Sequence, residues 1–181
     1  EELVTEPAGE EVINEPSASV VAKISDKEYT TLAAAVEDAD EGETVTLLES
    51  TEGAGIVIDK DITIDFDGNT YDIVGPAVGS AGTTTLGFQI LSGNTVILED
   101  GKITESAPAQ NGENETDKAV KMLVQNYSDL TLDNMVLDGS KLGGEGRYTL
   151  SNNCGEVLIT GKTKIIAEDN GEMAQAQEVL N

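Results

Sequence analysis

The sequence has no histidine, no tryptophan, one cysteine (Cys154) and one arginine (Arg147). Without histidine, the chain alone cannot build a Ser-His-Asp or a Cys-His catalytic site. The usual histidine and cysteine zinc sites are excluded for the same reason. A lone cysteine forms no disulfide within the chain, so we interpret Cys154 as a small buried side chain or a turn residue.

Aromatic residues make up only 3% of the 181 residues, and no apolar run approaches the roughly 18 residues of a membrane-spanning helix. The length is sufficient for one domain with a core. Because large aromatics are scarce, that core has to be built from Val, Ile, Leu and Ala. Such residues favour narrow, regular, stacked strands.

Basic residues are scarce as well, with 10 Lys and Arg against 35 Asp and Glu, which gives a net charge of −25. Nucleic acids and anionic membranes attract positive surfaces, so we predict that the chain binds neither. The chain begins with Glu-Glu and shows no signal peptide, which predicts a processed or trimmed start.

Three segments are predicted from local patterns. Residues 1–19 are acidic, contain two Glu-Pro steps and show no period, which predicts a flexible tail or a docking arm. Residues 20–170 are predicted to form one domain, with a short helix near 30–40 where apolar residues share a helical face. Residues 171–181 are predicted to be either a C-terminal cap helix or a tail.

The central part of the chain repeats itself. Four similar apolar segments begin at Ile62, Val96, Leu130 and Val157, and the first three starts are 34 residues apart (96 − 62 and 130 − 96). Each segment is preceded and followed by another short apolar segment. Repeating units of three short strands cannot bury their apolar faces alone, so stacking of successive units is expected.

The pattern resembles a known family. The stretch YTTLAAAVEDADEGETVTLL resembles the capped entry to a right-handed parallel β-helix, and ITIDFDGNTYDI and GNTVILEDGKITES resemble its coils. The resemblance is to pectate-lyase-like domains, in the non-catalytic type found in bacterial surface proteins and phage virion proteins. It implies an all-β fold: a right-handed, single-stranded parallel β-helix of about four to five coils with a short N-terminal capping helix.

One row of carboxylates follows from the repeat. Asp65, Glu99 and Asp133 occupy the same position in three successive units and should point to solvent. Carboxylates stacked about 4.8 Å apart repel one another and persist through solvation, raised pKa values, neighbouring Lys or a bound Ca²⁺. The row is therefore the candidate structural calcium site. No cofactor and no catalytic residue are assigned.

Three loops leave the repeat at equivalent places, and in repeat proteins such loops often form the binding face. Tyr127 and Tyr148 could stack on sugars if they are exposed. The partners expected at the loops are other protein subunits, such as capsid or cell-surface proteins, or glycans, and a homo-oligomer is an open alternative. The loops are 74–87, 106–119 and 139–147.

The leading hypothesis is a non-enzymatic structural or adhesive module, displayed outside the cell on a bacterial surface or on a virion. The alternative is a carbohydrate-binding module or a calcium-dependent polysaccharide lyase-like protein. The lyase reaction would need a cationic base beside the acidic residues, and Arg147 does not stand in an evident carboxylate cluster.

Overall fold

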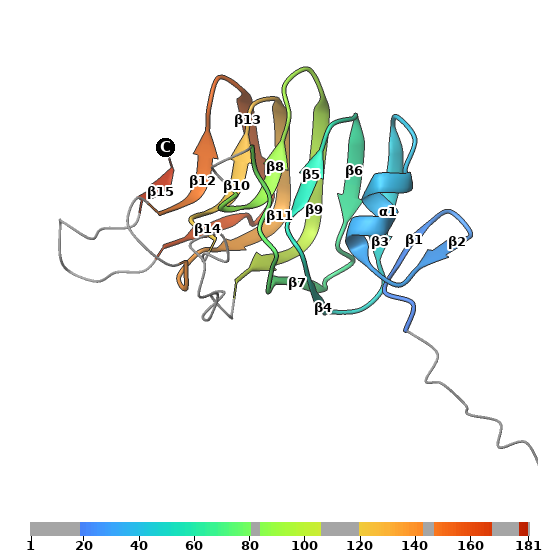
Figure 1. Cartoon of the computed structure of the whole chain (residues 1–181). Helices are drawn as coiled ribbons and strands as arrows, with labels where there is room; N and C mark the ends of the chain where they lie inside the picture. The colour runs from blue at the N-terminus through green and yellow to red at the C-terminus, as the bar shows by residue number, and fades with distance from the viewer. Residues whose placement is uncertain (1–18, 81–83, 106–119, 143–146, 168–177, 181) are drawn as a thin grey trace, which may run out of the picture.

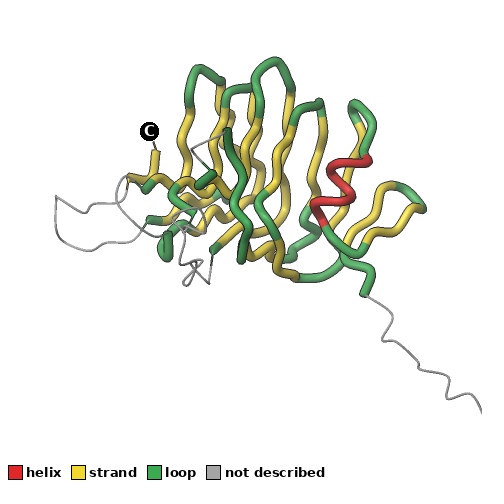
Figure 2. The backbone as a smooth tube through the Cα atoms, in the orientation of Figure 1, coloured by secondary structure: helices red, strands yellow, loops and turns green. Residues whose placement is uncertain are grey.

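The computed structural model describes residues 19–80, 84–105, 120–142, 147–167 and 178–180. These residues form two β-sheets and one helix (Figures 1 and 2). The elements are β1 (Ala22–Ile24), β2 (Lys27–Tyr29), α1 (Leu32–Asp38), β3 (Glu43–Leu47), β4 (Thr51–Gly53), β5 (Ile56–Ile58), β6 (Ile62–Asp65), β7 (Thr70–Ile73), β8 (Leu86–Ile90), β9 (Thr95–Thr104), β10 (Met122–Asn126), β11 (Asp129–Asp138), β12 (Tyr148–Asn152), β13 (Glu156–Thr160), β14 (Lys164–Ile166) and β15 (Glu178–Leu180).

The larger sheet has ten strands and the smaller sheet has five. The main path of the large sheet is β13-β11-β9-β6-β3-β1-β2, with β4, β7 and β14 attached beside it. The small sheet has the order β15-β12-β10-β8-β5 and is parallel throughout. In the view of Figure 1 the strands follow one another from the β1–β2 hairpin and α1 at one end to β12 and β15 at the other.

The prediction of a single-stranded, all-parallel β-helix is wrong. The large sheet is mixed, because β1 pairs antiparallel with both β2 and β3. The strands belong to two sheets, and one short helix, α1, lies between β2 and β3. The sequence pattern concealed the hairpin because β2 (Lys-Glu-Tyr) is three residues long and lacks the alternation that marks a strand.

The register between repeating units is confirmed by the strand pairing. Ile62 pairs with Val96, Val96 pairs with Leu130, and Leu130 pairs with Val157, all in parallel strands. The 34-residue spacing therefore places equivalent residues side by side. In the small sheet the spacing between these two units is 36 residues, since Phe88 pairs with Val124.

The second and third short strands of a unit join across a sharp bend. In β9 the bend lies at Asp100 (φ 54°) and in β11 at Asn134 (φ 53°). Both residues have the left-handed backbone that Asp and Asn tolerate better than most other residues. One long bent strand thus replaces the two separate strands that the sequence predicts.

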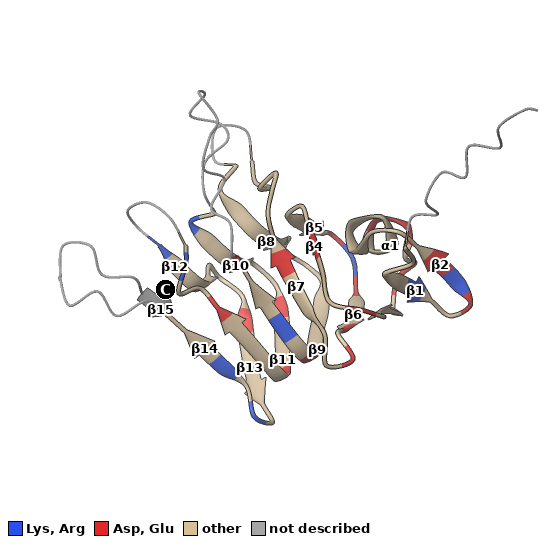
Figure 3. Ribbon diagram, turned by 90° about the horizontal axis from the view of Figure 1, so that it is seen from below, with Lys and Arg blue, Asp and Glu red and all other residues tan. Residues whose placement is uncertain are grey.

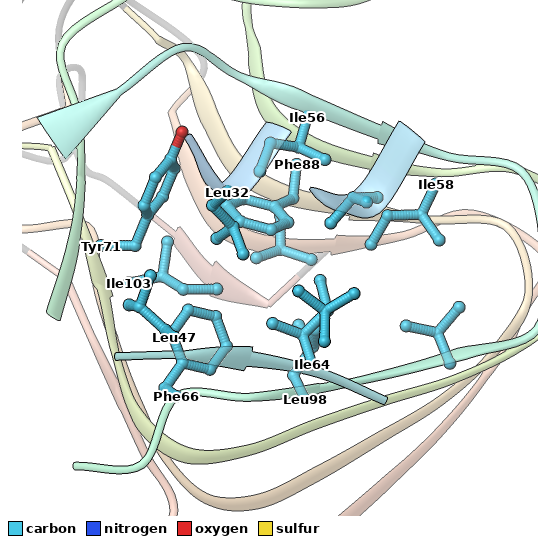
Figure 4. Packing of buried hydrophobic residues seen from close by; sticks show 14 of the residues in the cluster. Leu32, Leu47, Ile56, Ile58, Ile64, Phe66, Tyr71, Phe88, Leu98 and Ile103 are labelled. Atoms are coloured by element: carbon cyan, nitrogen blue, oxygen red, sulfur yellow. The ribbon is translucent and has the colours of Figure 1, made fainter. Parts of the chain in front are cut away.

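The core lies between the two sheets (Figure 4). Ile62, Ile64 and Phe66 point inward and are buried, as the alternation of residues 62–66 predicts. Tyr71 and Phe88 meet edge to face with ring centroids 5.8 Å apart, and the Tyr71 hydroxyl donates to the carbonyl of Ala54 (2.7 Å). The few aromatic residues thus fill one part of a core made mainly of aliphatic side chains.

The two ends of the core differ. At the N-terminal end, α1 buries Leu32, Ala35 and Val36 against the strands, and the Thr31 side chain caps the helix by accepting from the Ala34 amide (3.1 Å). At the other end, the edge strand β13 leaves Leu158 and Ile159 58% and 47% exposed. Glu178–Leu180 forms β15 rather than part of a cap helix, while 168–177, like the tail 1–18, lies outside the described residues.

Candidate functional site

The acidic row predicted from the repeat exists as a set of strand neighbours. Asp65 on β6 pairs with Glu99 on β9, and Glu99 pairs with Asp133 on β11. All three are half-buried on the outer face of the large sheet, opposite the inward row of Ile64, Leu98 and Leu132. The row is continued by threonines, with Thr46 beside Asp65 and Thr160 beside Asp133.

The electrostatics of the row centre on Glu99. Partial burial raises the pKa of the Glu99 carboxyl above its usual value, and the charges of Asp65, Asp100 and Asp133 raise it further. A carboxylate between two like charges holds its proton more tightly, because ionisation adds to the repulsion. Asp65 has one partner, since its Oδ1 accepts from the Asp67 amide (2.8 Å).

A shallow hollow lies beside this row at the strand bends. It has a volume of about 580 Å³ and is lined by Asp67, Asp100, Lys102 and Asn134, among others. The lysine does not neutralise the row, because its ammonium group forms an ion pair with Asp138 (2.7 Å). Figure 3 marks the positions of acidic (red) and basic (blue) residues along the ribbon of this sheet.

Within the described ranges, no three Asp, Glu or Cys side chains are arranged so that they could hold a metal ion. The three carboxylates are therefore neighbours in a row rather than a formed coordination shell, and calcium binding by Asp65, Glu99 and Asp133 stays a prediction. The carboxylates and threonines of this face supply oxygen atoms, which are the ligands that calcium prefers.

The cation that a lyase reaction would need is elsewhere. Arg147 directly precedes β12 of the small sheet, and its guanidinium donates to the carbonyl of Leu142 (3.0 Å). The acidic row is on β6, β9 and β11 of the large sheet. The structure thus does not bring Arg147 to the acidic row, and the lysine beside the row, Lys102, is paired with Asp138.

The remaining predicted features have mixed outcomes. Cys154 is an exposed turn residue between β12 and β13, with φ 68°. Loop 106–119 lies outside the described residues, as do 81–83 and 143–146 within the other two loops. Binding by these loops therefore stays a prediction.

The sequence did not reveal the open end at β13. The segment Val157–Thr160 was interpreted only as a fourth strand, yet it pairs with β11 on one side and forms the edge of the large sheet on the other. Its inward residues Val157 and Ile159 are partly exposed, whereas the equivalent Leu130 and Leu132 are buried. The available signal was position, because no later repeat of this segment follows Val157–Thr160 among the residues that the structure describes.

Comparison of the chain with protein-family models, with curated proteins and with solved structures gives no match. The family resemblance drawn from the sequence therefore stays a prediction. The described part of the chain contains no helix with enough length and apolarity to cross a bilayer.

Proposed function

We propose that this protein is a non-enzymatic structural module of an assembly on a bacterial surface or a virion, and that copies of it join through the open end at β13. The observation that carries the proposal is the contrast between the two ends of the core. One end is covered by α1, whereas the other ends in an edge strand with exposed apolar side chains.

An unpaired edge strand offers a row of backbone donors and acceptors to another chain. Pairing between chains is usually prevented where an edge strand is charged or very short. Strand β13 is five residues long and carries Val157, Leu158 and Ile159 at its centre. These side chains would lose exposed apolar area when a second strand covers them. Burial of such area is the main favourable contribution to association.

A second copy of the same chain suits this edge. Two β13 strands related by a twofold axis would pair antiparallel around Leu158, so that each apolar segment faces itself. Lys162 and Lys164 lie next to this strand and give the end a basic character that is unusual in a chain of net charge −25 (Figure 3). The strong acidic repulsion between copies is thereby reduced at this end of the molecule.

Three features support a role without catalysis. The chain has no histidine, the lysine beside the acidic row is paired with Asp138, and Arg147 is bound to a loop carbonyl. Display outside the cell is proposed from the sequence resemblance. The genes beside this one test it: capsid or surface-anchor genes are expected, and a neighbourhood of metabolic genes would contradict it.

The test of assembly is sedimentation velocity of the full chain over a wide concentration range. We expect a monomer–dimer equilibrium that Leu158→Lys weakens by about tenfold or more, because a charge would be buried at the centre of the interface. Val57→Lys is the matched control, since Val57 is an exposed (41%) strand residue on β5 of the small sheet. A monomer at every concentration, or equal effects of the two substitutions, would overturn the proposal.

A further inference from the structure

The outer face of the small sheet carries a second hollow, separate from both the acidic row and the β13 edge. Its volume is about 470 Å³, within the range of about 300–1,000 Å³ that is usual for small-molecule sites. Its lining consists of Asp59, Ser80, Gln89, Leu91, Ser92, Asn94 and Tyr127. These residues come from β8, from the turns that follow β5, β8 and β10, and from the segment before β8.

The repeat places an apolar surface at the base of this hollow. The Leu91 amide donates to the carbonyl of Ile58, and the Tyr127 amide donates to the carbonyl of Ile90. Leu91 and Tyr127 therefore follow adjacent strands at equivalent positions, about 4.8 Å apart. Leu91 is 37% exposed and Tyr127 is half-buried, so part of each side chain is available to a ligand.

Gln89 supplies the polar wall. Its side chain is on the outer face of β8 but is only 7% exposed, and it forms no hydrogen bond with another described side chain or backbone group. Most of the residue is covered, but its amide group stays accessible and has hydrogen-bonding capacity that a ligand or water can satisfy. An amide both donates and accepts, which matches a hydroxyl group in either role.

Asn94 is held in place beside Gln89. Its Nδ2 donates to the carbonyl of Leu91 (2.8 Å), and its backbone amide donates to the Ser128 hydroxyl (2.7 Å). The side-chain oxygen is then the group that Asn94 can offer to a ligand. Asp59 adds a carboxylate acceptor on the neighbouring strand end.

The charge of the hollow selects against anions. None of its lining residues is Lys or Arg. The nearest lysine in the sequence, Lys60, donates to the helix carbonyls of Glu37 (2.9 Å) and Ala39 (2.8 Å), so its charge is used to close the C-terminal end of α1. An anionic ligand would meet the Asp59 carboxylate without a compensating cation.

We propose that this hollow binds a neutral sugar, with one ring face on Tyr127 and Leu91 and its hydroxyl groups on Gln89, Asn94 and Asp59. A sugar ring combines an apolar face with a rim of hydroxyls that donate and accept, which is the pattern of groups in this site. The inference is carried by the hollow and by Gln89, and it does not depend on self-association at β13.

Affinity electrophoresis of the full chain tests it, with gels that contain soluble neutral polysaccharides (a β-glucan, a xylan, a galactomannan and a starch) or polygalacturonate. We expect retardation by at least one neutral polymer and none by polygalacturonate. Isothermal titration with oligosaccharides of the retarding polymer then gives the affinity. Tyr127→Ala should weaken binding by about tenfold, and Tyr127→Phe should leave it within about twofold because the ring face remains.

Tyr148→Ala is the matched control, since Tyr148 is a half-exposed tyrosine of the same sheet that does not line the hollow. Thermal melts verify that each variant is folded. Gln89→Leu provides an independent check, because it keeps the apolar bulk of the side chain while removing the amide. Lack of binding to every neutral polymer, stronger binding to polygalacturonate, or equal losses in the Tyr127→Ala and Tyr148→Ala variants would each overturn the proposal.

Discussion

Asp65 lies directly opposite Glu99 across the parallel strands β6 and β9. Like charges in this position are destabilising, by roughly 0.2–1 kcal/mol in measured strand pairs. Partial burial raises the pKa of Glu99, and the same repulsion between carboxylates raises it further. The acidic row therefore lowers the stability of the folded protein when all three carboxylates are ionised.

Glu99→Gln should therefore raise the stability at neutral pH. The folded protein holds the Glu99 proton more tightly than the unfolded chain, so the native pKa is above the unfolded value and stability declines as the pH rises through this interval. Glu99→Gln should remove the part of this fall in stability that ionisation of Glu99 causes. Chemical denaturation between pH 4 and pH 8 measures it, with Glu37→Gln on the exposed face of α1 as the control.

Calcium should stabilise the protein no more than magnesium does at the same concentration. The described carboxylates form a row without a coordination shell, so a divalent ion would act mainly by screening their repulsion. Thermal melts with each ion and with a chelator test this. A rise that is specific to calcium and lost in Glu99→Gln would instead establish the predicted site at Asp65, Glu99 and Asp133.

Glu105 should make the protein less stable at pH 8 than at pH 5. Its side chain is 1% exposed, its Oε1 accepts from the Val120 amide (3.2 Å), and its Oε2 has no partner among the described residues. Burial raises the pKa of Glu105 to about 7, and the charge of Asp72 adds to the shift. Between about pH 4.5 and pH 7 the folded state keeps a proton that the unfolded state has lost, so stability falls as the pH rises.

Glu105→Gln keeps an acceptor for Val120 and cannot ionise. It should flatten the pH dependence over this interval and stabilise the protein at pH 8 by an amount on the order of 2–3 kcal/mol. Denaturant midpoints at pH 5 and pH 8 for the wild type and the variant give the answer. An equal difference between the two proteins at both pH values would contradict the assignment.

Gly101→Ala should destabilise the fold by about 1–3 kcal/mol, as overpacking of a core does. A methyl group at Gly101 would collide with the Phe66 side chain and would lie 2.6 Å from the Asn69 carbonyl oxygen. Gly68→Ala is the comparison, because that position has open space but a left-handed backbone (φ 80°). Urea unfolding should give the larger loss for Gly101→Ala, and the reverse order would contradict the packing described for Phe66.

The sequence predicts those parts of the fold that depend on a regular pattern. The 34-residue spacing establishes the pairing of Ile62, Val96 and Leu130, because a shift of one residue would turn every apolar side chain to solvent. The spacing of Leu32, Ala35 and Val36 likewise predicts α1. Both features arise from burial of one face, which leaves a period in the sequence.

The features that the sequence did not predict depend on distant residues. The antiparallel β1–β2 hairpin is too short to show a period, so the fold was assigned as all parallel. The hollow of Gln89 and Tyr127 combines residues from three successive units, and Gln89 looks like an ordinary outward residue until the chain is folded. The acidic row was predicted in full, but whether an ion binds depends on side-chain geometry that spacing does not specify.

The capped end of the core also bears on how the chain matures during synthesis. The hairpin and the helix at residues 22–38 leave the ribosome before the later strands of the two sheets, so the covered end can form before those strands exist. Each later strand then emerges beside a finished neighbour that already displays free backbone groups in the correct register. Folding would then proceed in one direction along the nascent chain. At each stage the most recently formed edge strand would be the one able to pair with another strand.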